Sequence, residues 1–173
     1  MTATIPEVLE HPSSAQVLEI ITRAVFQAGV KWSQIAQHWP AYGEAFAQFD
    51  IAYVASLDAL DVERVLEHPG VLRVPKKVKA TVANAGVLLS IERQFGSFHD
   101  YVTSFADYAT LAKDMKKRFT GIGDMNVWYV LFRSGEAVPR FERWITSIPG
   151  EHPRMREMVE LARSQGRSRE REV

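Results

Sequence analysis

The chain has 173 residues, of which 46% are hydrophobic and 24% charged, which fits one globular domain rather than a disordered segment. Cysteine is absent, which excludes disulfides and thiolate zinc sites, and the five scattered histidines show no metal-binding spacing. The formal net charge is zero and no apolar run approaches the roughly 20 residues that span a bilayer, so we expect a soluble cytoplasmic protein without a signal peptide.

Apolar residues recur at helical spacing along most of the chain, and glycines and prolines divide it into helices. Ser13-Ser14 is suited to cap a first helix, which Gly29 ends. Shorter helices are then predicted over residues 32–39, 42–49, 56–60 and 61–66.

Pro75 is predicted to open a long helix, residues 76–95, which Gly96 ends. The helices predicted after it cover residues 99–105, residues 107–118, the stretch between Gly123 and Gly135, and the stretch from His152 or Pro153 to about Ser164. No segment has a convincing strand pattern, so the predicted fold class is all-α, with one helical domain over residues 1–164. Residues 165–173 alternate Arg and Glu and are predicted to form a charged flexible tail.

The strongest local feature is the run Lys116-Lys117-Arg118-Phe119-Thr120-Gly121-Ile122-Gly123-Asp124. Two glycines around one apolar residue allow a tight turn, with Ile122 packed between two helices and the amides of the turn directed outward toward an anion such as phosphate. Lys116 and Lys117 add positive charge at the same place. We predict a helix-hairpin-helix that holds a DNA backbone; the alternative is an ordinary helix connection beside a solvated charged face.

Two other segments could contact nucleic acid. In Phe26-Gln27-Ala28-Gly29-Val30-Lys31-Trp32, a large aromatic residue just past a turn could line a pocket and stack on a base, unless Trp32 belongs to the core. The turn at Gly70 brings Arg73, Lys76 and Lys77 to the start of a helix, where they could contact phosphate or simply be solvated.

Taken together, these segments resemble the 3-methyladenine DNA glycosylases of the Tag type, which belong to the helix-hairpin-helix glycosylase superfamily. The resemblance runs from about Leu18 to Ser134 and includes, in order, residues 26–32, 44–50, 61–66, 70–73, 77–80 and 84–85. It implies a helix-hairpin-helix DNA glycosylase-like helical bundle. It also implies a monomer that uses no cofactor and acts on double-stranded DNA containing a damaged base.

The resemblance further implies roles for individual residues. Trp32 contacts the extruded base, in a pocket that includes Ala24 and Phe26, and Val30 fills the gap left in the duplex. The residues that hold the DNA backbone are Gly121, Ile122 and Gly123.

Two features depart from that family. The family builds a zinc site from Cys and His near its two termini, whereas this chain has no cysteine and no counterpart of the amino-terminal segment that begins the site. The family also places a base-recognising Glu five residues before the glycine of the Gln-Ala-Gly turn, where this chain has Ala24.

One carboxylate could replace the missing Glu. Other members of the superfamily carry a catalytic Asp beyond the hairpin, and Glu142 falls near the corresponding spacing. We take Glu142 as the candidate catalytic residue, with a surface ion pair to Arg140 or Arg143 as the alternative.

The sequence therefore predicts a DNA repair glycosylase, associated with the nucleoid, that flips out and excises alkylated purines such as 3-methyladenine. A cationic alkylated base is already a good leaving group, so an aromatic pocket mainly has to hold it and admit water. Two alternatives remain open: a lesion-binding module of the same fold that has lost catalysis, and a helical scaffold with a different partner.

Overall fold

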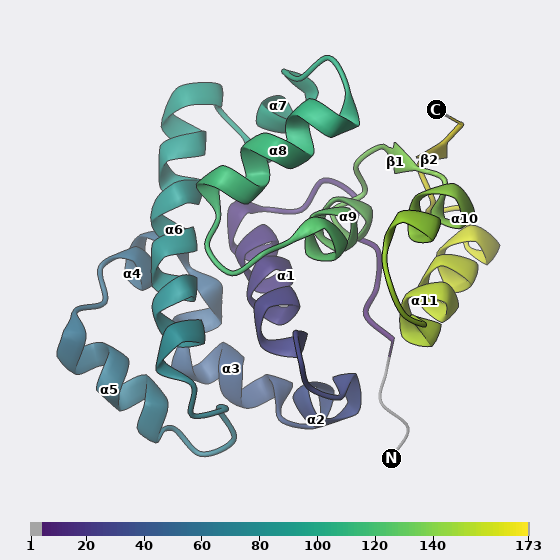
Figure 1. Cartoon of the computed structure of the whole chain (residues 1–173). Helices are drawn as coiled ribbons and strands as arrows, with labels where there is room; N and C mark the ends of the chain where they lie inside the picture. The colour runs from purple at the N-terminus through teal and green to yellow at the C-terminus, as the bar shows by residue number, and fades with distance from the viewer. Residues whose placement is uncertain (1–4, 173) are drawn as a thin grey trace.

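Helix α1 (Ser14–Gln27) lies at the centre of the structure, a computed structural model that describes residues 5–172. The long helix α6 (Pro75–Phe95) packs against one side of α1, and α9 (Asp124–Arg133) packs against the other (Figure 1). Most side chains of α1 are buried, including Leu18, Ile21 and Phe26. The all-α fold class is confirmed. The central position of α1 fixes where the residues at its two ends lie.

Shorter helices surround these three. In chain order they are α2 (Trp32–Gln37), α3 (Trp39–Ala45), α4 (Ile51–Ala55), α5 (Ala59–Glu67), α7 (Phe98–Thr103), α8 (Tyr108–Arg118), α10 (Phe141–Trp144) and α11 (Pro153–Ser164), with 3-10 turns at Ala47–Phe49 and Ile145–Ser147. Among the described residues, no helix combines the length and the apolar character that a membrane span requires.

The helix boundaries follow local capping signals. The Ser13 side chain accepts a hydrogen bond from the Gln16 N–H while the Gln16 side chain accepts one from the Ser13 N–H, which forms the capping box of α1. Gly96 ends α6 with a φ of 94°, as its predicted role requires. These capping signals involve residues close together in the sequence, so the ends of the first and the longest helices were predictable.

Between α1 and α6 the helices differ in detail from the prediction. The predicted helix 32–39 is interrupted at His38. Pro40 lies in the first turn of α3, where a backbone N–H has no acceptor within the helix, so proline is tolerated there. Gln48 has a φ of 55°, in the left-handed region, which separates α3 from α4. Helix α4 has no counterpart among the predicted helices, and the predicted helices 56–60 and 61–66 are replaced by α5, which Asp58 caps.

The carboxyl-terminal residues also differ from the predicted flexible tail. Strand β2 (Glu170–Arg171) pairs in parallel with β1 (Val138–Pro139), and the Arg140 N–H donates to the Arg171 carbonyl at 3.0 Å (Figure 1). Only two residues of each strand pair, so the fold class is unchanged, but the described end of the chain lies against the domain.

Candidate functional site: a cleft beside the hairpin

Helices α8 and α9 are joined by residues 119–123, as expected for a helix-hairpin-helix. Gly121 has a φ of 82°, and a Cβ atom there would lie 3.5 Å from both methyl groups of Val25, so this turn rests directly on α1. Ile122 is only 9% exposed and packs into the core, as predicted. Gly123 is the N-cap of α9, whose first backbone N–H groups have no acceptor within the helix.

The hairpin is fastened to α6 by one buried side chain. The Asn84 Nδ2 donates to the Thr120 carbonyl at 3.0 Å, and the Asn84 Oδ1 accepts from the Thr120 N–H at 2.7 Å. Asn84 is fully buried whereas Thr120 is exposed, so the two bonds are shielded from water on the side of Asn84. The turn therefore has a fixed position relative to α1 and α6.

Two of the predicted DNA-contacting lysines are engaged within the protein. The Lys77 Nζ donates to the carbonyl oxygens of Phe26 at 3.0 Å and Ala28 at 2.7 Å, so it caps the carboxyl end of α1, and desolvation lowers its pKa. The predicted contact of Lys77 with phosphate is thus not supported by its position. Lys116 pairs with Asp124 at 2.6 Å beside the hairpin.

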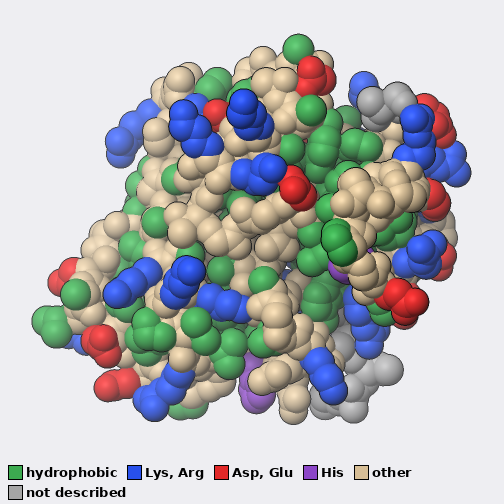
Figure 2. Space-filling view, viewed as in Figure 1, with side chains coloured by type: hydrophobic (Ala, Val, Ile, Leu, Met, Phe, Trp, Pro, Cys, Tyr) green, Lys and Arg blue, Asp and Glu red, His purple; other side chains and the backbone are tan. Residues whose placement is uncertain are grey.

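The other predicted cations remain at the surface. Lys76 and Lys117 are exposed on α6 and α8, and Arg73 is exposed while its Nε donates to the Leu66 carbonyl at 3.0 Å. Figure 2 shows Lys and Arg side chains distributed over α6 and α8 on the face that carries the hairpin. This face can attract a phosphate backbone although the net charge of the chain is zero.

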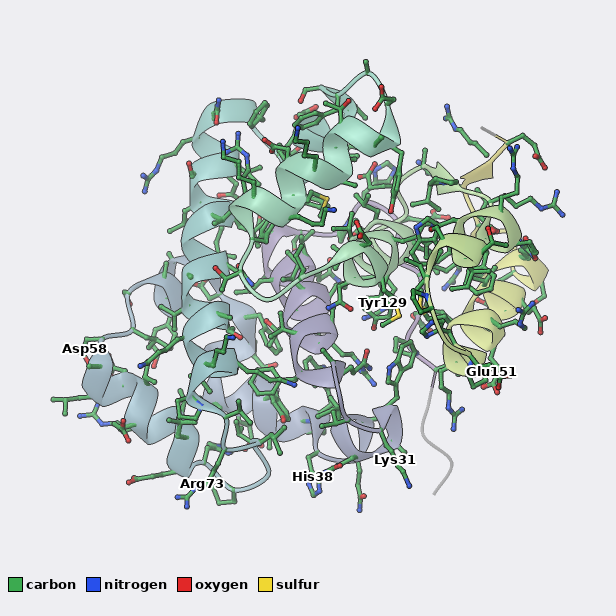
Figure 3. The ribbon with its side chains drawn as sticks, in the orientation of Figure 1. Lys31, His38, Asp58, Arg73, Tyr129 and Glu151 are labelled. Carbon is green, nitrogen blue, oxygen red and sulfur yellow. The ribbon has the colours of Figure 1, made fainter. Side chains whose placement is uncertain are left out.

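A cleft of about 380 Å³ opens between the α1–α2 turn and the start of α9. Trp32 lines it from α2 and Tyr129 from α9, and their rings meet edge to face with centroids 5.5 Å apart. A second space of about 500 Å³ continues the cleft outward past Trp32 to Glu151 and His152. Figure 3 shows Lys31 in the α1–α2 turn, Tyr129 on α9 and Glu151 in the segment before α11.

The predicted pocket residues divide into two groups. Trp32 and Val30 line both parts of the cleft. Phe26 points into the core, where its ring meets Tyr42 edge to face at 4.9 Å, and Ala24 is 2% exposed and is not among the lining residues. The structure therefore does not bring Ala24 or Phe26 to the cleft surface.

Sequence analysis missed most of the lining. The residues that it did not assign to a pocket are Gln27, Ala28, Gly29, Lys31, Met125, Asn126, Tyr129 and Met155. Met125 and Tyr129 lie one turn apart on the helix that follows the hairpin, and that spacing could have indicated a shared face. Met155 enters from α11, far along the chain, and no local signal marks it.

Two arginines lie behind the cleft wall. The Arg133 Nη1 donates to the Tyr129 hydroxyl at 3.3 Å, and the Arg23 guanidinium lies over the Trp39 ring at 5.0 Å. The Arg23 Nε is buried without a partner among the described residues, and burial lowers the pKa of this group. No carboxylate of the described residues lines the inner cleft, while Glu151 lines the outer part.

The sequence profile of the methyladenine glycosylase family matches residues 9–127, which is more than half of the chain. The chain belongs to the methyladenine glycosylase family. The matched region includes α1, the cleft residues of α2, the long helix α6 and the hairpin, and it ends within α9.

Curated relatives agree with this assignment. The chain is 31% identical over 102 residues to the DNA-3-methyladenine glycosylase of Haemophilus influenzae, which is 59% of this chain and 55% of the relative. It is 33% identical over 95 residues to DNA-3-methyladenine glycosylase 1 of Escherichia coli, which is 55% of this chain and 51% of the relative. The chain thus spans about half the length of the curated relatives it matches.

Solved structures of the family have the same fold. A crystal structure of a 3-methyladenine DNA glycosylase I (TAG) superimposes with a TM-score of 0.63 at 29% identity, covering 76% of this chain and 81% of that chain. The 3-methyladenine DNA glycosylase I from Staphylococcus aureus, solved to describe 3-methyladenine recognition, gives a TM-score of 0.65 at 26% identity, covering 75% and 80%.

The zinc site that the resemblance implies for this family does not fit the chain. Within residues 5–172, no three His, Asp or Glu side chains converge on a point where they could hold a metal ion, and the sequence contains no cysteine. We therefore derive no step of the chemistry from a metal.

Glu142, the predicted catalytic carboxylate, lies on α10 among arginines. Its two oxygens accept from the Arg163 Nη1 at 2.7 Å and Nη2 at 2.8 Å, and Arg140 donates to it at 3.4 Å. The bonds to Arg163 lower the pKa of Glu142 to about 2. Glu142 lines neither part of the cleft, so its position favours the ion-pair alternative, with Arg163 as the principal partner.

Proposed function

We propose that this protein is a DNA glycosylase that receives an extruded alkylated purine, such as 3-methyladenine, in the cleft that Trp32 and Tyr129 line. The observation that carries the proposal is the position of this aromatic cleft: it opens at the end of α1, the helix on which the hairpin turn rests, in a chain of the methyladenine glycosylase family. The hairpin would hold the phosphate backbone while the base enters the cleft.

The reaction is hydrolysis of the N-glycosidic bond. The bond between C1′ of the sugar and N9 of the base breaks, its electron pair stays with the base, and a water oxygen bonds to C1′ and releases a proton to solvent. A 3-methyladenine nucleoside carries a positive charge that disappears as the base leaves, so the base needs no prior protonation.

The charges around the cleft fit that change. Arg133 and Arg23 lie behind Tyr129. Their positive charges repel the positive charge of the bound base, so they favour the transition state, in which the base is losing that charge, over the bound substrate. Trp32, which is only partly buried, provides a ring surface on which the flat base can rest, and the buried Tyr129 ring supports Trp32 edge to face. This arrangement can assist departure of the base without a carboxylate in the inner cleft.

For the physiological setting, we propose that the protein acts as a monomer on double-stranded DNA in the cytoplasm, bound to the nucleoid. The exposed Lys76 and Lys117 on the hairpin face support DNA as the partner.

The test is release of free 3-methyladenine from methylated duplex DNA. Because aromatic stacking is worth about 1–3 kcal/mol per base, Trp32→Ala should lower the release rate at least about fivefold. Trp32→Phe keeps a ring in the same place and should retain most of the activity. If the wild-type protein releases no base above a no-protein control, the proposed function is wrong.

A second candidate is a lesion-binding module without catalysis. It is favoured by the inner cleft, which holds no carboxylate of the described residues, and by Ala24 in place of the family's base-recognising Glu. This candidate predicts preferential, salt-dependent binding to methylated duplex DNA without release of free base, and the same assay separates the two.

A further inference from the structure

The side-chain amide of Gln27 is the unpaired polar group at the cleft. Gln27 is the last residue of α1, is only 5% exposed, and lines the inner cleft together with Trp32 and Tyr129. Its Nε2 is buried and has no hydrogen-bond partner among the described residues. An unpaired buried amide costs about 1–3 kcal/mol, so a group in this state calls for an explanation.

The backbone carbonyl groups of residues 26–28 are engaged. The Lys77 ammonium binds the carbonyl oxygens of Phe26 and Ala28, on either side of Gln27. The carbonyl of Gln27 itself accepts from the Val30 N–H at 3.1 Å. These bonds fix the end of α1 and leave the Gln27 side chain as the group there that still lacks a partner.

We propose that the Gln27 carboxamide reads the edge of the extruded base that carries N6 and N7 of adenine. This inference rests on the proposed function. The Gln27 Nε2 donates to N7, and its Oε1 accepts from the N6 amino group, which is the two-bond pairing that carboxamides make with adenine. Trp32 and Tyr129 contact the rings of the base while Gln27 contacts one edge.

This pairing makes Gln27 a specificity-determining residue. Methylation of adenine at N3 leaves the N6 and N7 atoms free, so the lesion keeps both groups that Gln27 recognises. In 7-methylguanine the N7 atom is methylated and the N6 amino group is replaced by the O6 carbonyl, so the two bonds to adenine are lost and a single bond from the Gln27 Nε2 to O6 can replace them. The cleft should therefore prefer 3-methyladenine to 7-methylguanine because the carboxamide makes two bonds with the first base and at most one with the second.

The experiment measures binding of free bases by calorimetry, independently of catalysis. The probes are 3-methyladenine and its 7-deaza analogue, in which a C–H replaces N7. The wild-type protein should bind 3-methyladenine about tenfold more tightly than the analogue, since one hydrogen bond to a buried donor is lost. Gln27→Met, of similar length without polar amide atoms, should bind the two bases equally.

A second arm measures release of 3-methyladenine and 7-methylguanine from the same methylated duplex DNA. The ratio of the two rates should fall by about tenfold or more in Gln27→Met. Gln27→Glu keeps the shape but offers no N–H, and it should also lose the discrimination against the 7-deaza base. Gln94→Met, on the exposed side of α6, is the matched control and should change neither ratio.

The outcomes distinguish this inference from the function on which it rests. Equal discrimination by the wild type and both Gln27 variants, with 3-methyladenine still bound and released, overturns the role of Gln27 alone. If the wild-type protein neither binds nor releases 3-methyladenine, the proposed function fails together with the inference. Circular dichroism of each variant verifies folding, and Gln27→Glu carries the test if Gln27→Met is unfolded.

Discussion

Asn84 of the long helix and Thr120 of the hairpin are joined by two hydrogen bonds. The side-chain amide of Asn84 donates to the backbone carbonyl of Thr120 and accepts from its backbone N–H. The bond lengths are 3.0 and 2.7 Å, and Asn84 is fully buried. A Cβ atom at Gly121, the next residue, would lie 3.5 Å from Val25 of α1 and 3.7 Å from Ala80 of α6. The orientation of the hairpin is thus set by α6 and α1, and the carboxyl end of α1 also lines the cleft, so the position of the hairpin turn is coupled to the cleft.

Replacing Asn84 tests this coupling. Asn84→Ala leaves the Thr120 N–H and carbonyl without their partners, and we expect a loss of about 1–3 kcal/mol in the free energy of unfolding from two part-buried hydrogen bonds and a small cavity. The affinity for DNA, compared under conditions where the variant and the wild type are equally folded, should also fall because the turn loses its fixed position. Urea denaturation and fluorescence anisotropy with duplex DNA measure the two effects.

The matched control is Gln94→Ala on the exposed side of the same helix, which should change the stability by less than about 0.5 kcal/mol. Asn84→Ala that unfolds at the same urea concentration as the Gln94 variant would show that the two bonds do not fasten the hairpin.

Lys117 and Lys77 should behave differently although both were predicted to contact DNA. Lys117 is exposed beside the hairpin, so Lys117→Ala should reduce the slope of log affinity against log salt by about one unit and leave stability unchanged. Lys77→Met removes the bonds to the carboxyl end of α1, so it should lower the free energy of unfolding by about 1–3 kcal/mol without changing that slope.

Arg64→Ala removes one positive charge from α5 and provides the control for net charge. We would abandon the distinction if Lys77→Met changed the salt slope as much as Lys117→Ala does.

The two lysines show which features could be predicted from the sequence and which could not. The hairpin and the ends of α1 and α6 follow from glycine and capping signals within a few residues, and they were predictable. Lys77 could not be assigned correctly, because its partners, Phe26 and Ala28, lie about fifty residues away in the chain.

The cleft was only partly predictable for a related reason. Trp32 and Val30 follow a turn, and such residues often line pockets. Helix α1 is buried on nearly all sides, so its periodicity does not indicate which buried residue faces the cleft. The prediction named Ala24 and Phe26, whereas Gln27 is the buried residue of α1 that lines the cleft. Met155 and the β1–β2 pair come from segments separated widely in sequence, for which local patterns carry no information.

Glu142 should affect acid stability rather than catalysis. Its pKa in the folded protein, about 2, lies below its ordinary value of 4.5, so the stabilisation it provides is complete above that ordinary value and is lost as the pH falls toward 2. Glu142→Gln should therefore lower the free energy of unfolding at about pH 7, and the difference from wild type should shrink as the pH approaches 3. Base release at neutral pH should remain at the wild-type rate.

The control for Glu142 is Glu157→Gln, which breaks an exposed pair with Arg154 on α11 and should give a much smaller, pH-insensitive difference. A large loss of base release by a folded Glu142→Gln protein would restore Glu142 as the catalytic residue and contradict its assignment to the ion pair.

Arg163 holds the carboxyl-terminal region together. It binds Glu142 of α10 and also Glu170 of β2, whose side chain is 7% exposed, at 2.7 Å. Arg163→Met leaves the Glu170 carboxylate nearly buried without its cation, although the Phe141 N–H still donates to it. Because the Arg163 side chain itself is one-third exposed, we expect a loss of about 2 kcal/mol, below the range for fully buried pairs.

Urea denaturation measures this loss, and hydrogen exchange locates it. The N–H groups of Val138 and Arg140 donate to the carbonyls of Arg169 and Arg171, so they should exchange faster in Arg163→Met while those of α1 and α6 change little. Adding Glu170→Gln removes the unpaired charge and should recover part of the stability, whereas Arg154→Met on the same helix should cost less than about 0.5 kcal/mol. No recovery in the double variant would mean that Arg163 stabilises the region by packing and not by its charge.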